Sequence, residues 1–88
     1  MTYLLIRHRV ADFSKWKAAF DAHSGARAAA GLKDREVLHD LDDPDQVVLL
    51  FEVGDLQKAK DFSESDSLRE AMRGAGVTGK PDIYFLQR

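Results

Sequence analysis

The spacing of hydrophobic residues changes along the chain, and this change predicts a mixture of strands and helices. Apolar side chains alternate or run together where strands are expected, and they recur at every third or fourth position where helices are expected. The pattern predicts strands over residues 2–10, 35–42, 46–53 and 82–87, and helices over residues 12–30 and 55–75. The polar stretch SESDS interrupts the second helix, so the order of elements is strand, helix, strand, strand, helix, strand.

Polar residues and glycine at the ends of the predicted helices support their boundaries. Asp12 and Asp55 each precede an apolar helical stripe, where an aspartate can accept hydrogen bonds from free backbone amides. Gly31 is suited to end the first helix, because glycine readily adopts the backbone conformation that closes a helix. Ser67 and Glu70 have the spacing of a capping box, which predicts that the second helix restarts at Ser67.

This order of elements predicts the fold class. The turn-forming sequence DDPDQ at residues 42–46 indicates a hairpin between the second and third strands. With short connections and right-handed crossovers, the order folds as an α+β ferredoxin-like βαββαβ sandwich, in which two helices cover one face of a four-stranded antiparallel sheet. A chain of 88 residues suits one such domain, residues 1–88.

The predicted strands are apolar on both faces, whereas a sheet with one solvated face alternates apolar and polar residues. In the strand 46–53, for example, Leu49 and Phe51 point one way and Val48 and Leu50 point the other way. Two helices cover only one face, so a second layer must cover the other. A homodimer that stacks two sheets into an α/β barrel is the simplest solution, although a different protein would also serve. The residues expected at the dimer interface are Tyr3, Leu5, Val48 and Leu50.

Composition limits the partners and the chemistry. The formal net charge is −2 with acids and bases interspersed, so we expect no nucleic-acid partner. The absence of cysteine excludes disulfides, thiolate nucleophiles and cysteine-ligated metals. The sequence has no long apolar run and no leader peptide after Met1, and its apolar sheet face lacks a basic rim. We therefore expect a cytoplasmic protein that does not bind membranes.

Three stretches of the chain resemble a known group of proteins: HRVADFSKWKAAFD, DDPDQVVLLFEVGDLQKAKDF and SDSLREAMRGAGV. They are similar to the dimeric α/β-barrel superfamily, which includes antibiotic biosynthesis monooxygenases and small cyclase-like proteins. The resemblance implies a ferredoxin-like protomer, a barrel-shaped dimer and chemistry on aromatic polyketides without metal or flavin. The chain departs from the polyketide-oxidising branch because FEVGD lacks a tryptophan after the third strand. It departs from the haem-degrading branch because Phe62 stands where that branch has a histidine.

Three residues are the candidates for acid–base catalysis. His8 lies near the end of the first strand, where a pocket can open. Arg7 and Tyr84 could contact a ligand or transfer a proton. No His-x-His or His-Glu-x-x-His spacing predicts a metal site, and we expect no cofactor. His23, on the predicted first helix, is expected to lie opposite Leu4 to Ile6 of the first strand. It should therefore not lie beside His8, and the two histidines should not share a proton.

Four further residues are expected to line a ligand pocket: Trp16, Arg9, His39 and Glu52. Trp16 is interpreted first as core packing and second as a flat wall for an aromatic ligand. Glu52 lies on the strand next to the first one and is expected to pair with Arg7 or Arg9. Such a pair would be either an ion pair between strands or a polar group that binds a carboxylate or phenolate ligand.

Two classes of function stay open at this point. One is a monooxygenase, or a cyclase or isomerase, that acts on a small aromatic or polyketide-like molecule without metal or flavin. The other is a non-catalytic module of the same fold that binds a small hydrophobic ligand or serves assembly. The fold alone does not separate them, because it supports catalysts and non-catalysts alike.

Overall fold

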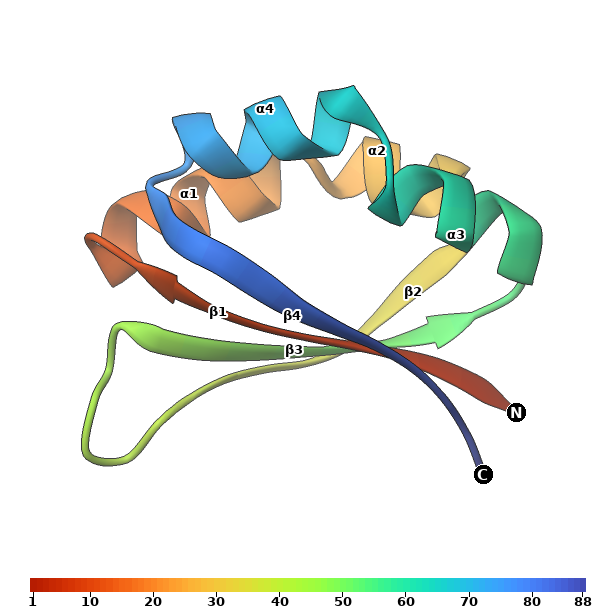
Figure 1. Ribbon diagram of the computed structural model, residues 1–88, viewed down its shortest axis with the longest axis horizontal. Coiled ribbons are helices and arrows are strands. Elements are labelled where there is room, and N and C mark those ends of the chain that lie inside the picture. Colours follow the sequence, from red (N-terminus) through yellow and green to blue (C-terminus); the bar gives the residue numbers. More distant parts are fainter.

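One four-stranded antiparallel sheet, covered on a single face by helices, organises the computed structural model of residues 1–88 (Figure 1). The elements in chain order are β1 (Thr2–Val10), α1 (Phe13–Ala22), α2 (Ser24–Ala29), β2 (Leu32–His39), β3 (Gln46–Val53), α3 (Leu56–Ser63), α4 (Asp66–Gly74) and β4 (Val77–Gln87). The strand order β2-β3-β1-β4 is that of a ferredoxin-like fold, so the predicted α+β class is confirmed. None of the helices combines the length and the apolar composition needed to cross a membrane.

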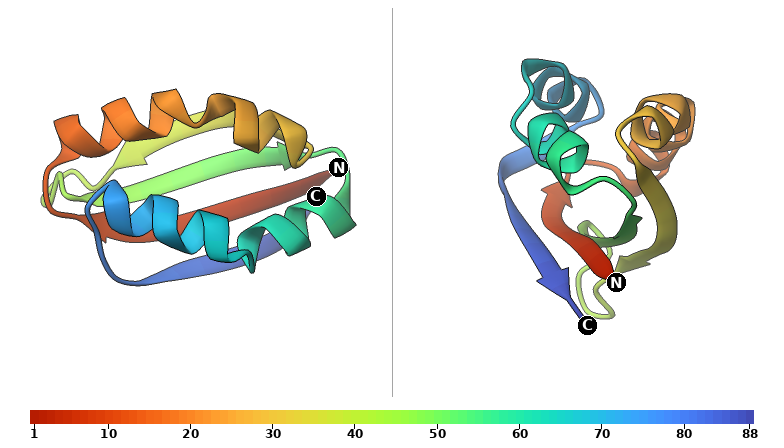
Figure 2. Two further views of the ribbon diagram at one scale, coloured as in Figure 1. Left: turned by 90° about the horizontal axis from the view of Figure 1, so that it is seen from above. Right: turned by 90° about the vertical axis from the view of Figure 1, so that its right-hand side faces the viewer.

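Each predicted helix is divided into two, and the two resulting rows run side by side over the sheet (Figure 2). The first row, α1 with α2, has its junction at His23, where the backbone leaves the helical conformation. The second row, α3 with α4, has its junction at Ser65. The Ser65 hydroxyl accepts a hydrogen bond from the Leu68 amide at 3.1 Å and donates one to the Phe62 carbonyl at 2.7 Å. The predicted restart at Ser67 was therefore wrong by two residues, because Ser65 caps α4 and ties it to α3.

The predicted caps at the starts of α1 and α3 are confirmed. The Asp12 carboxylate accepts from the Lys15 amide at 3.2 Å, and the Asp55 carboxylate accepts from the Lys58 amide at 3.0 Å. Strand β4 begins earlier than predicted and contains Pro81. This is tolerated because β4 is an edge strand that pairs only with β1.

The core lies between the helices and one face of the sheet. Strand β1 sends alternate side chains toward the helices, and β3 does the same. The core comprises ten buried hydrophobic residues: Leu4, Ile6, Val10, Trp16, Ala30, Leu32, Val47, Leu49, Phe51 and Ala59. The opposite face of the sheet carries no helix (Figure 1), so the two faces of β1 meet different surroundings.

Gly31 joins the end of α2 to the start of α3 through a close backbone approach. Its φ angle is +78°, a conformation that glycine adopts without steric cost. Its carbonyl accepts a hydrogen bond from the Gly54 amide at 2.8 Å. A β-carbon at this position would lie 3.2 Å from the Asp55 nitrogen and 3.3 Å from the Asp55 β-carbon. Both the conformation and the space therefore require glycine.

We predict that Gly31→Ala lowers the free energy of unfolding by about 1–2 kcal/mol, the cost of a left-handed backbone with a β-carbon. The matched control is Gly25→Ala in α2, where a β-carbon has nothing within 4 Å. Alanine favours helix over glycine, so the control should gain up to about 1 kcal/mol. Urea unfolding measures both, and equal stability of the two variants would contradict the prediction.

Candidate ligand-binding pocket

A cavity of about 230 Å³ lies between the sheet and the two rows of helices. Strand β1 contributes Ile6 and His8 to its lining, and α1 contributes Trp16 and Phe20. Helix α4 closes the other side with an apolar stripe that includes Met72. Thirteen of the seventeen lining residues are hydrophobic, so the few polar groups determine what chemistry the cavity offers.

His8 is the most unusual of these polar groups. It lies on the same face of β1 as Leu4 and Ile6, and therefore points toward the helices. Its side chain is only 3% exposed, and neither ring nitrogen has a hydrogen-bond partner within the chain. An unpartnered buried polar group costs about 1–3 kcal/mol, so its presence in a cavity calls for a functional explanation.

Burial determines the protonation state of His8. Loss of solvation lowers the pKa of His8 from 6.5 to about 4, because the charged imidazolium is disfavoured in an apolar environment. The ring is therefore neutral at pH 7. A neutral imidazole presents one N–H donor and one nitrogen acceptor, and neither is used by another group of the chain.

Aromatic rings form a continuous wall beside His8. The His8 and Trp16 rings meet edge to face with centroids 5.5 Å apart. Trp16 stacks on Phe20 at 5.0 Å, and the Arg27 guanidinium lies 3.5 Å from the centroid of Phe20. Trp16 is therefore both a buried core residue, as expected, and part of the cavity lining.

Sequence reasoning missed the role of Arg27, which is only 7% exposed and lines the cavity. Its guanidinium binds the Asp34 carboxylate through two hydrogen bonds, of 3.0 and 3.1 Å, and donates to the Phe20 carbonyl at 2.6 Å. A signal was present, because Arg27 falls on the apolar stripe of the first helix and Asp34 follows across the Gly31 turn. The positive charge of Arg27 is thus compensated where it borders the cavity.

Four predicted site residues lie on the face of the sheet that carries no helix: Arg7, Arg9, Glu52 and Tyr84. The expected pair between Glu52 and Arg7 or Arg9 was wrong. Glu52 is opposite Tyr3 in the sheet and Arg7 is opposite Val48, so the strand register separates them by four residues. Glu52 instead pairs with Arg35 at 3.5 Å, and Arg7 pairs with Asp82 at 3.4 Å.

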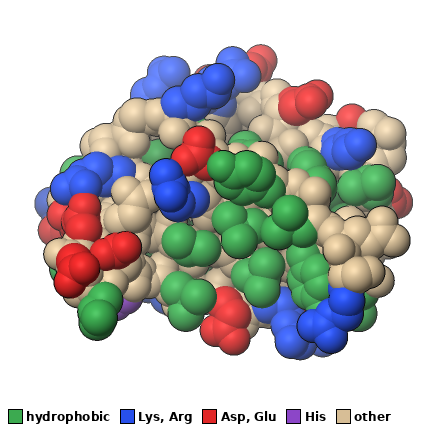
Figure 3. All heavy atoms as spheres, turned by 60° about the horizontal axis from the view of Figure 1, so that its bottom comes forward, with side chains coloured by type: hydrophobic (Ala, Val, Ile, Leu, Met, Phe, Trp, Pro, Cys, Tyr) green, Lys and Arg blue, Asp and Glu red, His purple; other side chains and the backbone are tan.

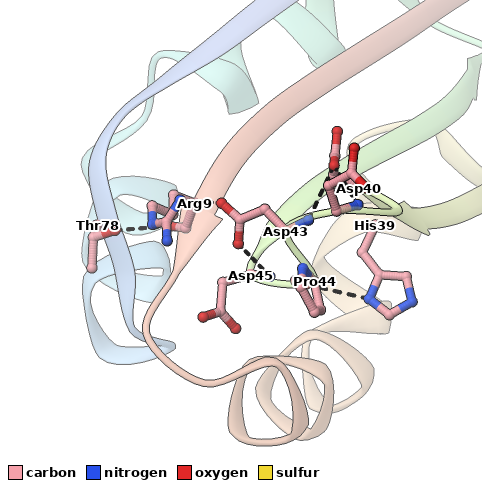
Figure 4. Close-up of polar contacts among 8 residues, drawn as sticks. Arg9, His39, Asp40, Asp43, Pro44, Asp45 and Thr78 are labelled. Atoms are coloured by element: carbon pink, nitrogen blue, oxygen red, sulfur yellow. Dashed lines mark hydrogen bonds and ion pairs between the residues drawn. The ribbon is translucent and has the colours of Figure 1, made fainter.

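Arg9 and His39 lie at the end of the sheet near the β2–β3 hairpin (Figure 4). Arg9 pairs with Asp43 of that hairpin. His39 stacks on Phe13 with centroids 4.8 Å apart, and its Nδ1 is 3.3 Å from the Pro44 carbonyl. Neither residue lines the cavity.

His23 lines the same cavity as His8, although the sequence analysis did not associate the two. Its Nδ1 is 2.8 Å from the Ala19 carbonyl. The turn at His23 between α1 and α2 leaves its side chain exposed at the helix junction. The chain has no group of three or more histidine and carboxylate side chains that could hold a metal ion.

We predict that His8 makes the protein less stable as pH falls. The unfolded chain takes up a proton near the ordinary pKa of 6.5, whereas the folded chain resists until about 4, so acid favours unfolding across that range. The unfolding free energy of wild type minus that of His8→Phe should fall by about 3 kcal/mol between pH 7 and pH 4. Urea titrations measure it, with His39→Phe as control. A constant difference would contradict the prediction.

Comparisons with known proteins support the fold. No family model and no curated protein matches the sequence. A candidate antibiotic biosynthesis monooxygenase from Bordetella bronchiseptica superposes with a TM-score of 0.78 at 14% identity, covering 99% of this chain and 95% of that chain. A mutant of SnoaB, a cofactor-independent oxygenase from Streptomyces nogalater, gives 0.74 at 12% identity, with 99% and 91% covered.

A protein of Mycobacterium tuberculosis superposes with a TM-score of 0.68 at 15% identity, covering 99% of this chain and 93% of that chain. Identities this low establish a common fold and leave the reaction open. The chain therefore has the ferredoxin-like fold of the antibiotic biosynthesis monooxygenases, as its resemblance to them predicted.

Proposed function

We propose that the protein binds a small aromatic molecule in the cavity beneath its helices and that His8 exchanges a proton with it. The observation that carries this proposal is the buried imidazole of His8, whose two nitrogens have no partner in the chain. The reaction class that follows is an oxygenation or a ring closure that needs neither metal nor flavin. The likeness in fold to a cofactor-independent oxygenase supports this class.

The size and lining of the cavity favour an aromatic ligand. An apolar protein cavity of roughly 150 Å³ holds benzene. The cavity of about 230 Å³ is thus suited to a molecule of two fused rings. Trp16 and Phe20 offer flat faces to such a ring system.

The chemistry of His8 follows from its neutral state. The lone pair on its unprotonated nitrogen can accept a proton from a phenolic hydroxyl or from an acidic C–H of the ring. This transfer leaves an anion on the ligand. The imidazolium and that anion then attract each other strongly because the apolar lining excludes water. An anion close to His8 also raises its pKa, so the base becomes stronger as the charge develops. The carbanion can then react with dioxygen, with one oxygen atom retained as a carbonyl and the other released as water, or it can add to a carbonyl carbon of the same molecule and close a ring.

A non-catalytic binding module is the alternative, and one observation favours it. His8 has no carboxylate or other hydrogen-bonded group to orient its ring. General bases in enzymes are commonly oriented by such a third group. In this alternative, His8 serves only as a hydrogen-bonding point for the ligand.

Catalysis is tested with a panel of hydroxylated naphthalenes, following oxygen uptake and product masses. If His8 is the base, His8→Phe should lower turnover by about 10²- to 10⁴-fold. His39→Phe should leave turnover unchanged, because His39 lies outside the cavity. Binding without turnover by the wild-type protein would select the binding module, and the absence of binding would overturn both functions.

A homodimer through the open sheet face is the second part of this proposal. The four residues expected at the interface, Tyr3, Leu5, Val48 and Leu50, lie on that face, which is opposite the helices. Figure 3 shows hydrophobic side chains gathered there, with charged groups around them. Leu38, Tyr84 and Leu86 add exposed apolar area at 51%, 52% and 44% exposure. Such a patch on a small protein supports association.

The roles of Arg7, Arg9, Glu52 and Tyr84 depend on this dimer. All four lie on the open face and would border the space between two stacked sheets. In that position Arg7 and Tyr84 would be catalytic groups or ligand contacts of a second, inter-subunit site. These four assignments stay predictions, and His39 does not line the cavity beneath the helices.

We predict that Leu50→Asp converts the dimer to a monomer, because a carboxylate on the apolar face would be buried without a partner. Sedimentation velocity measures the change. Leu56→Asp is the matched control, since Leu56 is 44% exposed on α3, away from that face. A wild-type monomer, or a dimer that survives Leu50→Asp, would overturn the proposed interface.

A further inference from the structure

We infer that the cavity has a second polar contact point at its mouth, formed by His23 and Ser67. It would select uncharged aromatic ligands that carry a hydroxyl group at each end. One hydroxyl would contact His8, and the other would contact His23 and Ser67. The inference rests on the proposed binding of an aromatic molecule and narrows it to a substrate class.

Both residues lie where a row of helices is interrupted. His23 forms the junction of α1 and α2, and Ser67 follows the junction of α3 and α4 by two residues. The two rows run side by side over the sheet (Figure 2), and both residues line the cavity while staying exposed to solvent. The cavity therefore reaches solvent near the two helix junctions, and these two polar side chains border its opening.

The hydrogen bonds of His23 define what it offers. A carbonyl oxygen only accepts hydrogen bonds, so the 2.8 Å contact from Nδ1 to the Ala19 carbonyl places the proton on Nδ1. In the neutral ring, Nε2 is then an acceptor, and it has no partner in the chain. The Ser67 hydroxyl also has no partner, and it can donate or accept. We expect the ligand hydroxyl to donate to Nε2 and to accept from Ser67.

The separation of the two polar points requires an elongated ligand. His23 follows Trp16 by seven residues, which is about 10 Å along a helix. Trp16 contacts the ring of His8, so the mouth lies about two helical turns from the level of His8. Apolar residues line the cavity between these levels, including Phe20, Phe62 and Met72. A ligand with one polar end would leave the other polar point without a partner.

The charge distribution favours uncharged ligands. Arg27 is the only cationic side chain of the lining, and Asp34 compensates its charge through two hydrogen bonds. His8 is neutral because burial lowers its pKa to about 4. A carboxylate entering the cavity would lose its water without gaining a free cation, and this transfer is costly. Phenolic hydroxyl groups lose less on desolvation and find partners at both ends.

The test uses three probes of equal ring size in isothermal titration calorimetry: 2-naphthol, 2,6-dihydroxynaphthalene and 2-naphthoate. One added hydrogen-bonded contact corresponds to about 3- to 10-fold in affinity, so the diol should bind that much more tightly than 2-naphthol. The carboxylate should bind at least about 10-fold more weakly than 2-naphthol. Equal binding of diol and naphthol, with both bound, would overturn the inference and leave the proposed function standing. If none of the probes binds, the proposed function fails first.

The variant series assigns the diol preference to the mouth. Ser67→Ala combined with His23→Phe should abolish the preference for the diol, measured as the ratio of the diol and 2-naphthol affinities. Ser24→Ala combined with His39→Phe is the matched control, because it removes the same two side-chain types outside the cavity lining. Ser67→Ala alone removes an exposed hydroxyl without a partner in the chain and should halve the preference or more, even if His23→Phe unfolds. A preference that survives both Ser67→Ala and the double variant would overturn the inference.

Discussion

The alternation of side chains along β1 is the constraint on which the rest of this structure depends. This strand lies between β3 and β4, so each of its residues must face either the helices or the open side of the sheet. Leu4 and Ile6 bury against the helices, and His8 shares their face. The same alternation sends Leu5 to the other side. One strand thus supplies the core, the polar group of the cavity and part of the proposed dimer interface.

The cavity exists because the two rows of helices do not fill the space above β1. A chain under selection for stability alone would place an apolar residue at position 8, since an unpartnered imidazole in this environment is destabilising. The aromatic wall of Trp16 and Phe20 is in turn held by Arg27, which binds Asp34 across the α2–β2 turn. A charged pair at the edge of the cavity therefore positions an apolar wall and adds no net charge to the cavity. This combination is suited to a neutral aromatic ligand and unsuited to an ionic one.

The spacing of apolar residues and the presence of capping and turn residues were enough to predict the order of elements, the hairpin and the caps at Asp12 and Asp55. These features depend on residues that are neighbours in sequence. The pairing of Glu52 was not predictable, because β2 has an irregularity between Asp34 and Glu36 that brings Arg35 to Glu52. The Arg27–Asp34 pair and the junction at His23 likewise depend on how the helices cross the sheet. His8 could be singled out from its place on the first strand, but its burial required the packed structure.

The cavity and the open face of the sheet are formed by different residues. The residues that line the cavity belong to the helices and to the helix-covered face of the sheet. Association through Leu5 and Leu50 would enclose the opposite face, with Arg7 and Tyr84 near its border. Since β1 is common to both, a change in its twist or register would move His8 and the interface together. A coupling between association and ligand binding would therefore have to pass through the backbone of β1, because no side chain of that strand faces both sides.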